Sequence, residues 1–161
     1  MMRKKPMLAY PVSDKPIDYN NTVFMQPKLD GVRCLIQRES DFPAQVVNPL
    51  YSQVCVKAYS RTGKQWLNID HILQSLKPFF QDNPDVILDG ELYNHALKDD
   101  FEKIISCVRK QKPTAIDRAE SRKLVQFHCY DIIDETMPFV DRIHWLRCNF
   151  TSVYGVRLVH T

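Results

Sequence analysis

The chain has 161 residues, the length of one ordinary domain, with 44% hydrophobic and 25% charged residues. These proportions are close to those of soluble globular proteins, so they exclude a disordered or low-complexity chain. The net charge of +3 is compatible with a nucleic-acid partner but does not indicate one, because such partners are bound by basic patches rather than by total charge.

The cysteines are odd in number and widely spaced, and no C-x-x-C pair occurs. This pattern argues against a disulfide framework and against a zinc site, and it favours reduced thiols in a cytosolic compartment. No apolar run follows the basic start of the chain, and no stretch is long enough to cross a membrane, so we expect neither a secretory signal nor a membrane partner.

In the first part of the chain, residues 1–20 are rich in proline and polar residues and predict an extended lead-in. The β-branched and aromatic run at 22–28 predicts a strand, and the strict alternation at 31–38 predicts another. Lys28 is therefore expected near a strand–turn–strand junction. Residues 39–53 predict a loop, and 54–60 predict a further strand that ends in a turn around Gly63.

Apolar residues at helical spacing predict a helix that begins after an N-cap at Asn68 and ends at Pro78. The same spacing predicts a second helix from Phe101 to Val108, with Asp99 or Asp100 as its cap.

A third helix is expected from Pro138 to about Phe150. The remaining apolar runs predict strands at 85–92, 123–133 and 156–161. The order of these elements predicts an α+β fold of mostly antiparallel sheets with flanking helices.

Four short motifs put charged or aromatic residues beside these apolar strands: "KLDGVR" at 28–33, "SRTGK" at 60–64, "DGE" at 89–91 and "FHCYD" at 127–131. Taken singly, the last three fit surface turns or core aromatics better than a site, and the His–Cys pair inside "FHCYD" has no second ligand pair for a metal. The first motif is more specific, and all four in this order are much less expected by chance.

The motifs resemble those of the nucleotidyltransferase domain of ATP-dependent DNA ligases, particularly compact viral or phage-like ones, over nearly the whole chain. The resemblance implies the ligase and capping-enzyme nucleotidyltransferase fold, which is ATP-grasp-like. It also implies ATP and Mg²⁺ or Mn²⁺ as cofactors and nicked duplex DNA as partner. In this family a lysine takes AMP from ATP and passes it to the 5′-phosphate of a nick. The 3′-hydroxyl then displaces AMP and seals the strand.

By this resemblance Lys28 is the nucleophile that becomes linked to AMP, and Gln26 lies near the adenine edge. Arg33 and Arg61 would contact phosphates of the nucleotide or of the nicked strand, with Lys64 in the same basic turn as Arg61. Arginine suits this role because its planar guanidinium donates two parallel hydrogen bonds to a phosphate.

The resemblance also assigns Glu91 to the ribose and Tyr130 to stacking on the base, with Phe127 as the second choice for stacking. Asp30 and Glu91 are the expected metal ligands, since magnesium prefers oxygen ligands and keeps several waters or phosphates. We expect Asp30 to hold the ion or orient its loop rather than to touch the amine.

A lysine can act as a nucleophile only through its neutral amine, and a free lysine has a pKa of about 10.4. Nearby cations therefore have to favour the neutral form. Arg33, Arg61, Lys64 and a bound divalent ion are the cations that the motifs supply.

Two later motifs of the family are missing, because no Glu-Gly pair follows "DGE" and no Lys-x-Lys follows Lys123. The β-barrel (OB-fold) domain that usually clamps DNA is also absent. We therefore expect residues 1–161 to be a single, partial nucleotidyltransferase domain, incomplete at its C-terminus. Such a truncated or split ligase would have reduced activity and would need a missing C-terminal segment or a second chain.

Two other functions stay open. An mRNA capping guanylyltransferase or an RNA ligase shares the lysine motif and a similar acidic motif, whereas the "SRTGK" turn and the "PMLA" lead-in favour a DNA ligase. A non-catalytic module that binds nucleotides or DNA ends would keep the motifs without turnover. The cytoplasm is the expected location, or the host cytoplasm for a viral protein, with the nucleus as an alternative.

Overall fold

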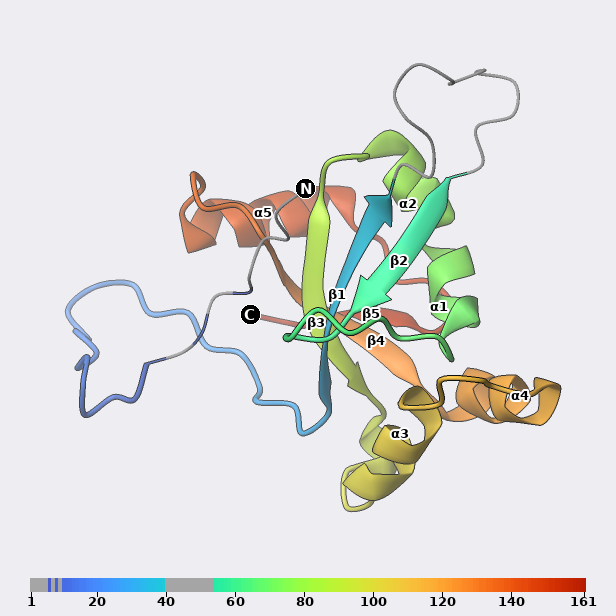
Figure 1. The fold of residues 1–161 in the computed structure, drawn as a ribbon. Coiled ribbons are helices and arrows are strands. Elements are labelled where there is room, and N and C mark those ends of the chain that lie inside the picture. Colours follow the sequence, from blue (N-terminus) through green and yellow to red (C-terminus); the bar gives the residue numbers. More distant parts are fainter. Residues whose placement is uncertain (1–5, 7, 9, 40–53) are drawn as a thin grey trace.

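The computed structural model describes residues 6, 8, 10–39 and 54–161. In this part of the chain a five-stranded sheet has the order β2-β1-β3-β4-β5 (Figure 1). The strands are β1 (Val32–Glu39), β2 (Cys55–Tyr59), β3 (Ile87–Tyr93), β4 (Gln126–Ile132) and β5 (Val156–Leu158). All neighbours pair antiparallel except β4 and β5, which are parallel. The predicted α+β class with mostly antiparallel pairing is confirmed.

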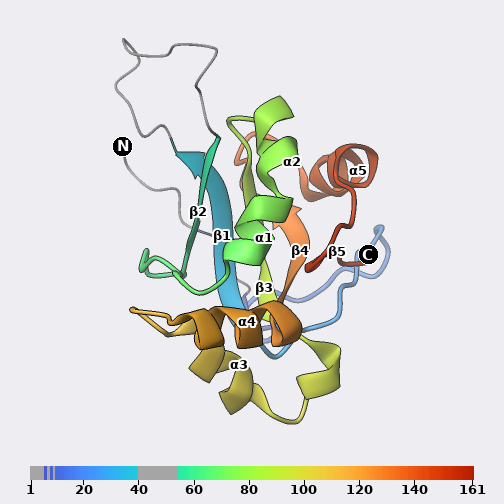
Figure 2. The same cartoon turned by 90° about the vertical axis from the view of Figure 1, so that its right-hand side faces the viewer.

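Helices cover one face and one end of the sheet (Figure 2). They are α1 (Asp70–Ser75), α2 (Lys77–Asp82), α3 (Phe101–Val108), α4 (Ala115–Leu124) and α5 (Phe139–Asn149), with a short 3₁₀ turn at His95–Leu97. Figure 2 shows α1 and α2 in front of the sheet, α5 beside β4 and β5, and α3 and α4 at its lower end. Residues 10–31 lie on the side of the sheet away from α1 and α2 (Figure 1).

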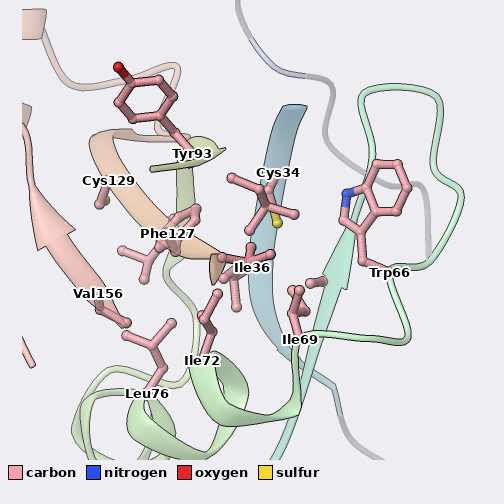
Figure 3. Packing of buried hydrophobic residues seen from close by; sticks show 14 of the residues in the cluster. Cys34, Ile36, Trp66, Ile69, Ile72, Leu76, Tyr93, Phe127, Cys129 and Val156 are labelled. Atoms are coloured by element: carbon pink, nitrogen blue, oxygen red, sulfur yellow. The ribbon is translucent and has the colours of Figure 1, made fainter. Parts of the chain in front are cut away.

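The core lies between the sheet and these helices. Alternation along β1 sends Cys34 and Ile36 to the helical face, where both are fully buried. Ile72 and Leu76 come from α1 and its C-cap, and the ring of Phe127 comes from β4, as Figure 3 shows. Burial of each of the larger side chains, Ile36, Leu76 and Phe127 among them, stabilises the fold by roughly 1.5–3 kcal/mol. Because this face is filled by apolar groups, polar side chains on the central strands gather on the opposite face.

The strand predicted at 22–28 is wrong. Residues 22–30 form neither helix nor strand, although their composition is β-branched and aromatic. In the described part of the chain both sides of β1 are already paired, with β2 and β3, and no other strand runs beside this segment. Strand composition alone does not make a strand without a partner for its backbone. The predicted loop at 39–53 lies, from residue 40 on, outside the described residues.

The predicted boundaries of the first helix are also wrong. Ile69 rather than Asn68 is the N-cap of α1. Asn68 is buried, and its Nδ2 donates to the carbonyl oxygens of Cys107 and Asp117 at 2.9 and 3.2 Å, so it joins α1 to α3 and α4. Pro78 does not end a helix but lies in the first turn of α2, where its missing N–H costs nothing.

Helix α4 was not predicted, because its apolar stripe is sparse. A capping box starts it: Thr114 Oγ1 accepts from the Asp117 N–H, and the Asp117 carboxylate accepts from the Thr114 N–H. This helix runs through Leu124, so the strand predicted from residue 123 begins only at Gln126. The other two predicted helices are confirmed, and Asp100 caps the first of them.

No helix among the described residues combines the length and the apolar character needed to cross a membrane.

Candidate active site

The polar face of the sheet brings together three of the four sequence motifs. Arg33 on β1 pairs in register with Glu91 on β3, and Glu91 pairs with His128 on β4. Side chains that are paired in this way lie on the same face of a sheet. Lys28 and Asp30 are exposed on the segment that leads into β1, and the charges of both act on Glu91.

Gly31 and Gly90 allow backbones to approach closely at this site. A Cβ added at Gly31 would lie 2.4 Å from the carbonyl oxygen of Leu92 and 2.8 Å from Cγ of Glu91, so only glycine lets the Lys28 segment lie against the end of β3. A Cβ added at Gly90 would lie 2.6 Å from the Phe127 ring and 2.4 Å from the His128 carbonyl oxygen. The interpretation of "DGE" as a surface turn is wrong, because these residues lie inside β3, and its glycine is required by packing.

Arg33 makes a two-point contact with a buried carboxylate at the site. Its Nε donates to Oδ1 of Asp89 at 2.6 Å and its Nη2 donates to Oδ2, a two-point pair with a carboxylate that is 1% exposed. The Cζ atom of Arg33 also lies 5.1 Å from the centroid of the Tyr130 ring, within the range of a cation–π contact.

Glu91 is half-buried, and burial raises the pKa of its carboxyl group to about 7. The positive charge of Arg33 acts most strongly in the opposite direction, with a smaller contribution from Lys28. The negative charges of Asp89 and Asp30 add to the effect of burial. A carboxyl group whose pKa is raised to near neutral, among other charged side chains, is a candidate for chemistry.

Tyr130 and Phe127 have different surroundings. Phe127 is 0% exposed and packs in the core, so the second choice for a stacking ring is not available at this face. Tyr130 is half-buried beside Arg33, and its burial raises the pKa of the phenol group. Gln26 is held next to it: Nε2 of Gln26 donates to the Tyr130 carbonyl oxygen at 2.9 Å and to Thr161 Oγ1 at 2.8 Å.

The "SRTGK" turn is confirmed, and Arg61 and Lys64 are exposed on it. Gly63 has a φ of 85°, a conformation that glycine adopts without strain, and its N–H donates to the Ser60 carbonyl oxygen at 2.9 Å. The turn follows β2 at the end of the sheet where β1 begins. Among the described residues, no hydrogen bond or ion pair joins the Arg61 or Lys64 side chain to Lys28 or Glu91.

A second buried ion pair lies next to the site and was not predicted. Asp131 pairs in register with Asp89, and Arg142 of α5 donates from Nε and Nη2 to the two Asp131 oxygens at 2.8 and 2.9 Å. The only sequence signal for these acids is that both interrupt otherwise apolar strands. Their partners lie 56 residues away for Asp89 and 11 residues away, on another element, for Asp131, so no local spacing could identify them.

The described residues contain no cluster of three or more His, Cys, Asp or Glu side chains that could hold a metal ion. Asp30 and Glu91 are close enough for the charge of one to act on the other. Two carboxylates fit magnesium when phosphate and water supply its remaining oxygen ligands. The arrangement as a whole offers an exposed amine, an acceptor carboxyl group and a supported aromatic ring on one face.

Comparisons with known proteins identify the family and the fold of the chain. The model of a family described as "ATP dependent DNA ligase domain" matches residues 6–156. A solved structure described as "DNA binding with a minimal scaffold: Structure-function analysis of Lig E DNA ligases" is similar to this chain with a TM-score of 0.64 and 17% identity, over 99% of this chain. Another, named "Pmar-Lig_PreS3", has a TM-score of 0.55 and 20% identity over 84% of this chain.

The chain spans 51% of the length of the first of these structures and 29% of the second. At these identities the likeness shows a shared fold. The comparison with curated proteins found no significant match.

Proposed function

The chain belongs to the ATP-dependent DNA ligase domain family, and from this we propose that it carries the adenylation step of such a ligase, with Lys28 as the residue that accepts AMP. The observation that supports the proposal most directly is the position of Lys28. Its amine is exposed at the polar face of the sheet, where its charge acts on Glu91.

The proposed step is a displacement at phosphorus. The Lys28 amine attacks the α-phosphorus of ATP, the N–P bond forms, and the bond to pyrophosphate breaks as the amine loses its proton to solvent or a nearby base. Tyr130 would stack on adenine, and Gln26 would face the adenine edge. Glu91 in its ionised form would accept hydrogen bonds from the ribose hydroxyls. Such a transfer depends mainly on positioning and on stabilising charge.

Asp30 and Glu91 are the residues that would hold a divalent ion together with phosphate oxygens. When bound, Mg²⁺ or Mn²⁺ would neutralise charge on the phosphates and favour departure of pyrophosphate. The side chains of Asp30 and Glu91 would orient these oxygens from the segment before β1 and from β3.

The later steps are proposals for a ligase that contains this chain. AMP would pass from Lys28 to the 5′-phosphate of a DNA nick, and the 3′-hydroxyl would then seal the strand. Arg61 and Lys64 are exposed cations on the turn at the Lys28 end of the sheet, and they would bind phosphates of the DNA.

Covalent labelling tests the proposal. The chain is incubated with magnesium and ATP that is radiolabelled at the α-phosphate, and it is then separated by denaturing electrophoresis. We expect a weak labelled band in the wild type, because the Lys-x-Lys motif is missing. No band is expected in Lys28→Ala or Lys28→Arg, and the wild-type level of label is expected in Lys123→Ala, an exposed lysine on α4. Label that persists in both Lys28 variants would refute the assignment, and so would a wild type that neither takes label nor binds ATP.

Competition with other nucleotides and substrates separates the related enzymes. Excess unlabelled ATP should remove the label and GTP should not, whereas a capping guanylyltransferase would show the reverse. Sealing of nicked DNA but not of nicked RNA by a ligase that contains this chain would exclude an RNA ligase. Binding of ATP without any covalent label would instead favour a non-catalytic module.

A further inference from the structure

We propose that Arg33 is a positioning residue that holds the Tyr130 ring in place for the base, rather than a ligand of the nucleotide phosphates. This inference rests on the proposed function, in which Tyr130 is the stacking surface. It replaces the phosphate contact that the motif resemblance implies for Arg33. Asp89 then has a role as well, because it holds the Arg33 guanidinium.

The first reason is how Arg33 uses its guanidinium. Nε and Nη2 form the side-on edge of the guanidinium, one of its two edges that can bind a carboxylate or a phosphate at two points, and here both donate to Asp89. A phosphate cannot use this edge while Asp89 holds it. Asp89 is 1% exposed, so releasing it would leave a buried carboxylate without its main partner.

The second reason is that Arg142, whose charge also acts on Asp89, is already engaged by the neighbouring carboxylate. Asp131 lies beside it in register, and Arg142 already binds Asp131 through two hydrogen bonds at 2.8 and 2.9 Å. Each of the two neighbouring carboxylates therefore has its own guanidinium. If Arg33 moved toward a ligand, Asp89 would lose its two-point partner and would still face the negative charge of Asp131.

The third reason is the contact between Arg33 and the ring. The guanidinium carbon lies 5.1 Å from the Tyr130 centroid, so the ring packs against a cation that is itself fixed by Asp89. The backbone of Tyr130 is held separately by the hydrogen bond from Gln26 at 2.9 Å. A ring fixed in this way is preorganised, so it loses little freedom when a base stacks on it.

The two roles of Arg33 predict different ligand dependences. A phosphate ligand contributes to binding of ATP but not to binding of adenosine, which has no phosphate. A residue that positions the ring contributes equally to adenosine, AMP and ATP, because all three carry the base. Calorimetric titration of the whole chain with these three ligands therefore distinguishes the two roles.

We expect Arg33→Met to weaken binding of adenosine, AMP and ATP by the same factor, about five- to tenfold. Asp89→Asn should act in the same direction through Arg33. Arg33→Met should add little when Tyr130 is already alanine, because the ring that it supports is gone. The matched control is Arg122→Met, since Arg122 lies 5.5 Å from the ring of Tyr154, away from the site, and its loss should leave all three affinities unchanged.

Arg33→Met leaves the buried Asp89 carboxylate without its two-point partner, so the folding of the single variants is checked by circular dichroism and thermal melting. The double variant Arg33→Met/Asp89→Leu removes both charges and avoids this problem. It should melt near the wild type but still bind adenosine more weakly. Normal adenosine affinity in this folded double variant, or a loss confined to ATP, would overturn the inference.

Failure of the proposed function gives a different result. In that case the wild type would bind neither adenosine nor ATP and would take no label on Lys28. If Tyr130→Ala binds adenosine as the wild type does, the stacking assignment is wrong. If the wild type binds and labels normally but Arg33→Met keeps its adenosine affinity, only the role of Arg33 is refuted.

Discussion

At the scale of single residues, the partial burial of Glu91 makes its ionised form destabilise the fold. Its folded pKa of about 7 is above the ordinary value of 4.5. Between these two values the unfolded chain has already lost the proton that the folded chain still holds. Below pH 4.5 the chain is therefore as stable as a variant with a neutral side chain at position 91. Its free energy of unfolding falls below that of the variant as the pH rises through about 7.

We predict that Glu91→Gln raises the melting temperature at pH 8 and has little effect at pH 4.5. An increase of about 2–4 °C corresponds to about 1 kcal/mol in a domain of this size, which allows for partial exposure of the group to solvent. Differential scanning fluorimetry across this pH range measures the effect. The same substitution should abolish labelling of Lys28, because a neutral amide cannot replace the carboxylate as a metal ligand.

The control for this prediction is Glu102→Gln, an exposed glutamate in the first turn of α3. Its melting temperature should follow the wild type at every pH. If Glu91→Gln gained nothing at pH 8, Glu91 would not carry the expected burial penalty.

At the scale of elements, the pair of Arg142 and Asp131 fixes α5 to β4. Both residues are buried, and Arg142 Nη1 also donates to the Met137 carbonyl oxygen at 2.6 Å, just before the helix begins. The pair therefore fixes both the helix and the loop that leads into it. Because Asp131 directly follows Tyr130 in β4, the pair also fixes the part of the strand that carries Tyr130.

We predict that Arg142→Met destabilises the chain by about 3–5 kcal/mol, because it leaves the Asp131 carboxylate buried and unpaired. Adding Asp131→Asn should restore much of this loss, since the amide is neutral and can still accept from the Ile132 N–H. Urea unfolding measures both variants. Arg147→Met, at an exposed arginine of the same helix, should cost no more than about 0.5 kcal/mol. Equal losses for the two arginine variants would contradict the role of the buried pair.

Elements whose pattern is local could be predicted from the sequence. Alternation identified β1, and helical spacing with a cap identified α3. Helix α4 was missed because its capping box, rather than an apolar stripe, defines it. The prediction of a strand at 22–28 was wrong for the opposite reason. The composition of this segment is that of a strand, but no strand pairs with it in the described part of the chain.

Some residues of the candidate site could likewise be predicted from local patterns, and others could not. The motifs identified Lys28, Glu91 and Tyr130 as a group, and the structure brings their strands and the Lys28 segment to one face. The partner of Arg33 could not be predicted, because Asp89 is 56 residues away and meets it only through the register of β1 and β3. Pairing across a sheet depends on register, which no short motif encodes.

At the scale of the whole molecule, the two faces of the sheet have different consequences for stability. Apolar residues and helices cover one face and supply the burial that drives folding (Figure 3). The other face carries titratable groups that are partly withdrawn from water, and these make stability depend on pH. Glu91 and His128 face each other in register there, and their effects on stability have opposite signs.

Burial lowers the pKa of His128 to about 4 from its ordinary value of 6.5, and the nearby charge of Arg157 acts in the same direction. Below pH 6.5 the unfolded chain takes up a proton that the folded chain does not, so stability falls as the pH falls toward 4. We predict that His128→Gln reduces this acid loss by about 2–4 °C in melting temperature, while His144→Gln, at an exposed histidine of α5, leaves it unchanged. Melting curves between pH 7.5 and 4 measure the difference. Parallel curves for His128→Gln and the wild type would mean that His128 is not the group that couples acid to unfolding.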